Sequence, residues 1–326
     1  MSEQRNTAIF INGGAGRVIA SIPALELFAK ENPDDDFVIV CEGGTDFYKG
    51  HSTLHARAYD VWHKNLFQDK LKNMDLCTPE PYRVWEYYNQ KCSIAQAYDI
   101  CINNKGLRDL HRPVIKLNRQ EQMFGQGLVN EVKEKTKKDK VIVFQPYGRA
   151  VQNQNGLVSD FSGRSFEADN AVSIVRKLSN KVGIIHMAEF HMDFSKHNVK
   201  HPIACPQGAD LRAWSGIIWA ADYFLGCDSA GQHIVHALDK KGTVVIGSTF
   251  PENVSYPDDK NLDILDMGDG KRVYSPIRVT TDEYSDRVND GIMYMNSKIE
   301  DVIIESVMNG IKGKKKIGTQ YTNKES

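Results

Sequence analysis

The sequence predicts an α/β fold made of two Rossmann-like halves with parallel sheets. Short apolar runs of strand length alternate with longer segments of helical period along most of the chain. In addition, each half carries a glycine-containing turn between a predicted strand and a predicted helix, where open α/β sheets bind ligands. A chain of 326 residues is long enough for two domains. We expect them at residues 1–138 and 139–326, divided near the Lys-rich segment 133–140 (KEKTKKDK).

The first half begins with a βαβ pattern. It predicts a buried strand at 7–12, a helix at 17–30 with Pro23 near its first turns, and a second strand at 37–41. Residues 43–72 read as irregular. Further along we expect helical segments over 79–98, a strand near 99–102 and a helix at 120–134.

The turn between the first strand and the first helix contains Gly13, Gly14 and Gly16. Glycines allow backbone N–H groups to approach an anion at the positive end of a helix. A dinucleotide fingerprint would use Glu42 to bind the ribose, but Ile19 occupies its third glycine position. A plain tight turn is a further alternative, and a site for another anionic or polar ligand is favoured.

The second half predicts a longer α/β series. Strands are expected at 141–145, 182–186, 202–204, 223–225 and 244–246, with helices at 166–178 and 298–311. The stretch 211–251 is the most informative, because it reads helix, strand, polar turn, helix and strand in succession.

The polar turn of that stretch is a candidate ligand site. Its members are Asp228, Ser229, Ala230, Gly231, Gln232 and His233. Asp and Ser alone are consistent with helix caps, and the histidine with a packed side chain. Because all of them meet at one strand-to-helix turn, we favour a ligand. Arg149 and Arg164 flank loops in the same half, where an arginine either grips a phosphate or lies solvated at the surface.

Composition limits the classes of function. Hydrophobic residues make up 41% and charged residues 25%, which is typical of a soluble globular protein. The net charge is −1, so overall charge does not indicate binding to nucleic acid. No signal peptide or apolar run of about 20 residues is found, so we expect a cytoplasmic protein without a membrane span. The six cysteines have no CxxC spacing and read as reduced thiols.

A His-rich run is the main candidate for metal binding. Its spacing matches no HExxH pair, and it crosses a strand end and a loop, so we expect no metal site there. The run consists of His186, Glu189, His191, Asp193, His197 and His201.

Two segments carry a resemblance to a known family. They are GGAGRVIASIPALELFAKENPDDDFVIV in the first half and ADLRAWSGIIWAADYFLGCDSAGQHIVHALDKKGTVVIGSTFP in the second. With them, the chain resembles the heptosyltransferase-like glycosyltransferases, which include the lipopolysaccharide ADP-heptose transferases. The second match is the more specific, and residues 43–120 contribute little to it. The resemblance implies a GT-B fold, in which two Rossmann-like domains face a cleft.

The resemblance also implies a donor site in the second half. A nucleotide-sugar, used without a metal or other cofactor, would be bound by residues 228–233. Gly148 would offer its amide to the diphosphate, together with the basic side chains Arg149 and Arg164, and Glu189 would border the nucleotide. Transfer in this family is expected to invert the configuration at the sugar carbon.

One departure from the family pattern concerns catalysis. The family usually carries an Asp just after the glycine turn as the general base, whereas this chain has Arg17, which cannot accept a proton usefully. Asp46 is then the nearest alternative acid by topology. Alternatively, Arg17 binds an anionic acceptor, or the chain is a non-catalytic nucleotide-sugar-binding or scaffold protein.

The sequence leaves two classes of acceptor open. A surface saccharide is the default that the resemblance implies. A hydroxymethylated base in phage DNA is the alternative, because Arg17 and the Lys-rich segments would suit a phosphate backbone.

Overall fold

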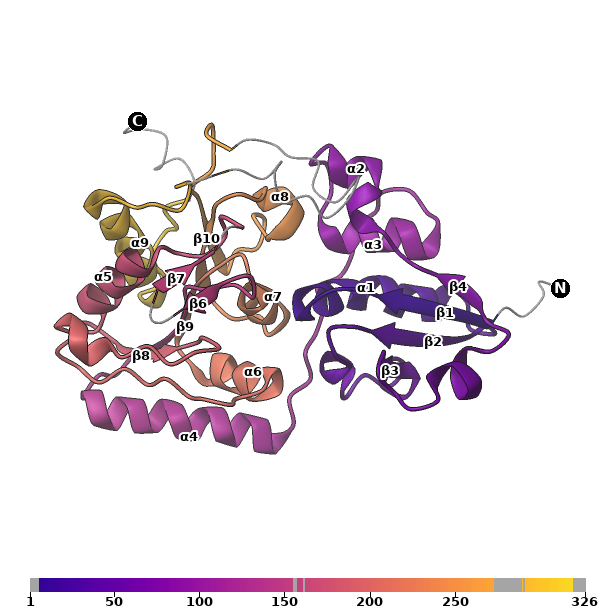
Figure 1. Ribbon diagram of the computed structural model, residues 1–326, viewed down its shortest axis with the longest axis horizontal. Coiled ribbons are helices and arrows are strands. Elements are labelled where there is room, and N and C mark those ends of the chain that lie inside the picture. Colours follow the sequence, from indigo (N-terminus) through magenta and orange to yellow (C-terminus); the bar gives the residue numbers. More distant parts are fainter. Residues whose placement is uncertain (1–5, 155–156, 161, 273–288, 290, 319–326) are drawn as a thin grey trace. The chain divides into compact units, whose positions relative to one another are not determined.

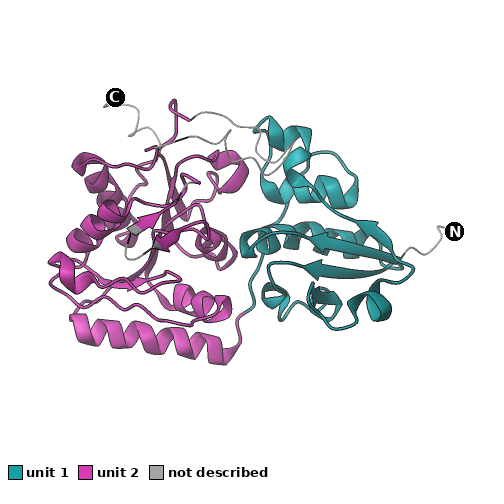
Figure 2. Cartoon of the chain, viewed as in Figure 1, with its two compact units in different colours: residues 1–116, 276–282 teal, residues 117–275, 283–326 magenta. Residues whose placement is uncertain are grey.

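The computed structural model describes residues 6–154, 157–160, 162–272, 289 and 291–318. These residues form two compact units, one ending at Lys116 and the other beginning at Leu117 (Figure 2). Each unit is built around its own parallel sheet (Figure 1). The α/β class predicted from the sequence is therefore confirmed.

Unit 1 contains a four-stranded sheet in the order β3-β2-β1-β4, with all strands parallel. The helix α1 packs against α3, and its residues 18–25 are buried on all sides. The elements are β1 (Asn6–Ile11), α1 (Ala15–Glu31), β2 (Asp36–Cys41), η1 (Asp46–Tyr48), η2 (His55–Arg57), β3 (Ala58–Asp60), η3 (Phe67–Leu71), β4 (Asp75–Cys77), η4 (Pro81–Arg83), α2 (Trp85–Tyr88) and α3 (Ile94–Asn103).

Two expectations for unit 1 were wrong. The segment 99–102 is the end of α3, not a strand, because a capping box of Ser93 and Gln96 starts a helix whose apolar residues recur at helical spacing. Pro23 lies in the interior of α1 and not near its first turns. There it denies the carbonyl of Ile19 the N–H donor that another residue would supply.

Unit 2 contains a five-stranded parallel sheet in the order β11-β10-β9-β5-β8. The helices α5 and α9 pack on each other, while α6 packs on both α4 and α7. The elements are α4 (Arg119–Thr136), β5 (Val141–Gln145), β6 (Gln152–Gln154), β7 (Leu157–Ser159), α5 (Ala168–Leu178), β8 (Gly183–His186), η5 (Phe194–His197), α6 (Leu211–Ala220), β9 (Tyr223–Cys227), α7 (Ala230–Ala237), β10 (Gly242–Ile246), α8 (Pro251–Val254), β11 (Leu262–Asp266) and α9 (Ser297–Ile311).

The division between the units falls before α4, whereas the sequence suggested a division after it. The reason is that α4 packs against α6, where Arg212 Nε donates to Glu121 Oε1 at 2.7 Å. The Lys-rich segment 133–140 is therefore the last turn of α4 and the approach to β5. Lysines suit that place, because the C-terminal end of a helix attracts cations.

Other differences in unit 2 are small. The strand expected at 202–204 is only a bridge between Ala204 and Ile185. The edge strand β11 and the hairpin of β6 and β7 were not expected. In the part of the chain that is described, no helix is both long and apolar enough to cross a membrane.

Candidate functional site

The carboxyl edge of the unit 2 sheet contains a switch point between β5 and β9. From β5 the chain reaches β8 on one side and β9 on the other, and ligands of open α/β sheets bind where the connections diverge in this way. Gln145 ends β5 and bridges this point. Its Nε2 donates to Ser229 Oγ at 3.0 Å, and its Oε1 accepts the N–H of Gly231 at 3.0 Å.

Asp228 connects the loop after β9 to the loop after β10. It is 5% exposed and accepts hydrogen bonds from Gln232 Nε2 at 2.7 Å and Thr249 Oγ1 at 2.9 Å. Burial raises the pKa of Asp228, which the positive charge of Arg164 and the two hydrogen bonds oppose. Asp228 therefore joins α7 to the loop after β10.

The segment between β5 and α5, here called the loop after β5, includes the hairpin of β6 and β7. Asp160, just after β7, holds this loop together. Its carboxylate accepts the N–H of Ser162 at 2.7 Å and that of Ser165 at 3.2 Å, and also both hydroxyls. Ser165 Oγ in turn accepts the N–H of Gly148 at 2.9 Å. The amide expected to bind a diphosphate is thus already engaged within the loop.

Arg164 is the half-buried cation of this edge. Its Nε donates to Ser162 Oγ at 3.2 Å, and its charge acts on the carboxylate of Asp228. The same loop docks on the loop after β10, because Ser248 donates its N–H to Gly163 O at 3.1 Å and its hydroxyl to Ser162 O at 2.5 Å. The loops after β5, β9 and β10 therefore converge.

The remaining expected donor residues differ in exposure. His233 is buried with Nδ1 2.6 Å from the hydroxyl of Tyr256, and burial together with the nearby His236 lowers the pKa of His233 to about 3, so its ring is neutral. Arg149 and Glu189 have exposed side chains. Ala230 is the first residue of α7, which has no capping hydrogen bond from Ser229 and no acidic residue in its first turn.

The unit 1 sheet has its own switch point, between β1 and β4. There Arg17 Nε donates to the hydroxyl of Tyr82 at 3.2 Å, and the guanidinium lies over the Tyr82 ring at 4.5 Å. Its Nη1 also donates to Asn12 O at 3.0 Å. Arg17 thereby connects the turn after β1 to the segment after β4.

Arg17 is a half-buried cation. Burial alone would lower the pKa of Arg17, but the phenol groups of Tyr82, Tyr98 and Tyr87 raise it above its ordinary value. Among the described residues, no carboxylate forms an ion pair with this guanidinium. Arg17 is therefore available to an anionic group.

The glycine turn after β1 is filled by the protein's own side chains. The N–H of Gly13 donates to Glu42 Oε2 at 2.5 Å. On the other side, a Cβ on Gly13 would lie 2.6 Å from Arg17 Cδ and 2.8 Å from Nε, and the φ of Gly13 is +94°. Because Glu42 binds this amide, a dinucleotide pyrophosphate does not have it free, which weighs against the dinucleotide interpretation.

Asp46 begins η1, in the segment that follows β2. Its Oδ1 forms an ion pair with Lys49 Nζ at 2.5 Å, and the Asp46 side chain is 40% exposed. The preceding loop touches the glycine turn, because a Cβ on Gly43 would lie 2.6 Å from Gly13 O and 2.7 Å from Gly14 C.

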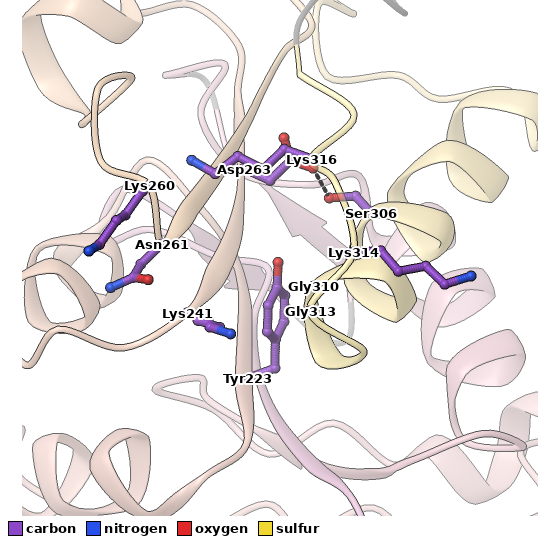
Figure 3. Close-up of a pocket in the computed structure, with 10 residues that line it drawn as sticks. All are labelled: Tyr223, Lys241, Lys260, Asn261, Asp263, Ser306, Gly310, Gly313, Lys314 and Lys316. Atoms are coloured by element: carbon purple, nitrogen blue, oxygen red, sulfur yellow. Dashed lines mark hydrogen bonds between the residues drawn. The ribbon is translucent and has the colours of Figure 1, made fainter.

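A separate cavity of about 220 Å³ lies at the opposite, amino edge of the unit 2 sheet (Figure 3). Asp263 in its wall accepts from Ser306 Oγ at 2.6 Å and from the N–H groups of Ile317 and Gly318 at 3.0 and 2.9 Å, which fastens the segment after α9. Lys314 and Lys316 in the wall follow the C-terminal end of α9, which attracts cations. The lining residues are Tyr223, Lys241, Lys260, Asn261, Asp263, Ser306, Gly310, Gly313, Lys314 and Lys316.

The His-rich run does not assemble into a cluster. His186 is buried among Phe144, Tyr147 and Phe194, and burial lowers the pKa of His186 to about 4. Within the described residues, no group of three or more His, Cys, Asp or Glu side chains is arranged to hold a metal ion.

Sequence reasoning missed several residues of the unit 2 edge. Gln145 reads as the end of an apolar strand, although a polar residue in that place is itself a signal. Asp160 is followed by Ser162, a spacing that is typical of an Asx turn. Thr249 could not be found in this way, because its bond to Asp228 joins two separate loops.

No protein-family model and no curated protein matches this sequence. Among solved structures, the chain is similar to a glycosyl transferase family 9 protein from Veillonella parvula, with 10% identity, a TM-score of 0.68, and coverage of 96% of this chain and 99% of that one. It is also similar to ADP-heptose lipopolysaccharide heptosyltransferase II of E. coli, with 10% identity, a TM-score of 0.57, and coverage of 80% and 90%.

A third similar structure is the iron-containing dodecameric glycosyltransferase TibC from enterotoxigenic E. coli. Identity is 11%, the TM-score is 0.51, and 97% of this chain and 81% of that one are covered. The chain has a GT-B fold. At these identities the likeness concerns the fold, and on that level the resemblance to heptosyltransferase-like glycosyltransferases is confirmed.

Proposed function

We propose that this protein is a glycosyltransferase that moves a sugar from a nucleotide-sugar to an acceptor hydroxyl. The observation that carries the proposal is the convergence of the loops after β5, β9 and β10 at the switch point of unit 2, where the charge of Arg164 acts on Asp228. The similar solved structures, which include a heptosyltransferase, support the same reaction class.

The donor would bind at this edge. Arg164 and the positive end of α7, whose first turn has no acidic residue, would stabilise the charge that develops on the leaving diphosphate. These groups would act without a metal. The exposed Arg149 and Glu189 would contact the outer part of the nucleotide, and the neutral ring of His233 would supply a hydrogen bond rather than a charge.

The acceptor would be engaged by unit 1. Arg17 is a fixed cation at the switch point, so an acceptor with a phosphate or carboxylate group fits it. We propose an anionic surface saccharide as the acceptor class, with DNA carrying hydroxymethylated bases as the alternative. Transfer would invert the configuration at the sugar carbon, because the acceptor oxygen would displace the diphosphate directly.

A turnover assay tests this function. The protein is incubated with labelled ADP-, UDP- and GDP-sugars, together with a lipopolysaccharide core saccharide or an oligonucleotide carrying hydroxymethylated bases. We expect one nucleotide class to release nucleoside diphosphate and to transfer or hydrolyse its sugar. Tight binding of a nucleotide-sugar with neither reaction would instead support a non-catalytic binding protein, which the presence of Arg17 in place of an acid favours.

A further inference from the structure

We propose that Glu42 is the general base that takes the proton of the acceptor hydroxyl. This inference rests on the proposed glycosyl transfer and names a catalytic residue for it. The motivating contact is the hydrogen bond from the N–H of Gly13 to Glu42 Oε2 at 2.5 Å. It places a carboxylate directly on the glycine turn, although the residue after that turn is an arginine.

The backbone around Glu42 holds this carboxylate in place. The N–H of Glu42 donates to Ile11 O at 3.1 Å, which extends the pairing of β1 and β2 by one residue. The next residue, Gly43, lies so close to the peptide groups of Gly13 and Gly14 that no side chain fits there. One carboxylate oxygen is therefore fixed by a hydrogen bond, and the side chain is exposed at the carboxyl edge of the two central strands.

The second oxygen is free to accept a proton. Within the described part of the chain, Oε1 of Glu42 has no hydrogen-bond partner. The guanidinium of Arg17 lies against the other side of Gly13, so a cation and a free carboxylate oxygen flank the same turn. An anionic acceptor bound by Arg17 would thus present its hydroxyl beside Glu42.

Other acids on this side of unit 1 are less suitable. Asp46 is engaged in an ion pair with Lys49 at 2.5 Å. Asp60 ends the edge strand β3 and accepts the N–H of Trp62 at 3.0 Å, so it lies away from the switch point. Glu42 is the acid that contacts the turn itself.

The proposed step balances without another reagent. The acceptor oxygen forms a bond to the anomeric carbon of the donor sugar, and its proton passes to Glu42 Oε1. The bond from that carbon to the diphosphate oxygen breaks, and its electron pair leaves with the nucleoside diphosphate. Glu42 then returns the proton to solvent.

The decisive variant is Glu42→Gln. The glutamine carbonyl still accepts the Gly13 N–H, but the side chain cannot accept a proton at neutral pH. With the labelled nucleotide-sugars and acceptors named above, we expect kcat to fall by about 100-fold or more. Donor Kd, measured by calorimetry, is expected to stay within about twofold. We further expect formate to restore part of the rate of Glu42→Ala, which a purely structural role would not allow.

Asp46→Asn is the matched control, and we expect it to keep the wild-type kcat. Retention of kcat in Glu42→Gln, or its loss in Asp46→Asn alone, would refute the role of Glu42 while leaving glycosyl transfer intact. Absence of transfer and of donor hydrolysis in the wild-type protein would overturn both the role and the proposed function.

Discussion

At the scale of single residues, Glu26 connects three segments of unit 1. Its carboxylate lies 2.9 Å from His51 Nδ1 and 2.7 Å from His111 Nε2, and His51 Nε2 lies 2.7 Å from Val114 O. Burial alone would raise the pKa of Glu26, but the two histidines outweigh it and hold the pKa below the ordinary value of 4.5. A carboxyl group with a lowered pKa stabilises the folded state only while it is ionised.

The pH dependence of unfolding tests this contact. Stability from Glu26 is present above the unfolded pKa and is lost as pH falls through the folded one, that is, below about 4.5. We expect the Tm of Glu26→Gln to fall less steeply than that of the wild type between about pH 5 and pH 3. Glu305→Gln, at an exposed position of α9, is the control and should follow the wild type. Identical slopes for Glu26→Gln and the wild type would contradict the assignment.

Single residues also mark how far the sequence predicts the site. The turn from Asp228 to His233 is predicted as a ligand site because small polar residues follow a strand and precede a helix. Glu42 was noticed as well, but for ribose binding, because its distance along the sequence matches that motif and its contact with Gly13 is not visible without the structure. The engagement of the Gly148 amide by Ser165 likewise depends on how the loop folds back.

At the scale of elements, α4 illustrates how packing assigns a helix to one unit. Its own sequence predicts a helix well, within two residues at each end. Its partner, however, is α6, which begins at Leu211 far along the chain, and periodicity contains no information about which helix packs on which. The strand expected at 99–102 failed for a related reason, because a short apolar run alone does not distinguish a strand from a buried helix.

A pair of glycines in α4 tests the packing of these helices. A Cβ on Gly125 would overlap the carbonyl of Gly216 in α6, whereas a Cβ on Gly127 would meet nothing within 4 Å. We expect Gly125→Ala to lower the free energy of unfolding by about 1–3 kcal/mol through overpacking. Gly127→Ala should raise it by about 0.5–1 kcal/mol, because alanine favours a helix.

Urea unfolding of both variants provides the measurement. Because both substitutions are the same change in one helix, helix propensity contributes equally to them. Equal stabilisation by the two alanines would mean that α4 and α6 do not approach as closely as described.

At the scale of the whole molecule, the described residues form two parallel sheets, each with its own switch point. Arg17 and Tyr82 meet at one of them, and Gln145 and Ser229 at the other. The alternation of strands and helices predicted this architecture, because it follows from local patterns. The sequence does not show which of the two cationic regions of unit 2 receives an anion, since lysines and arginines occur at both edges of the sheet.

The most direct measurement is therefore the binding of nucleoside diphosphates by two variants that each remove one positive charge from unit 2. Arg164→Gln changes the carboxyl edge, and Lys241→Gln changes the cavity at the amino edge. With the nucleotide that gives the largest thermal shift, calorimetry should show Kd increased about tenfold or more by Arg164→Gln, as for a lost charge-assisted hydrogen bond. Lys241→Gln should leave Kd unchanged. The reverse pattern would contradict a donor site at the switch point between β5 and β9.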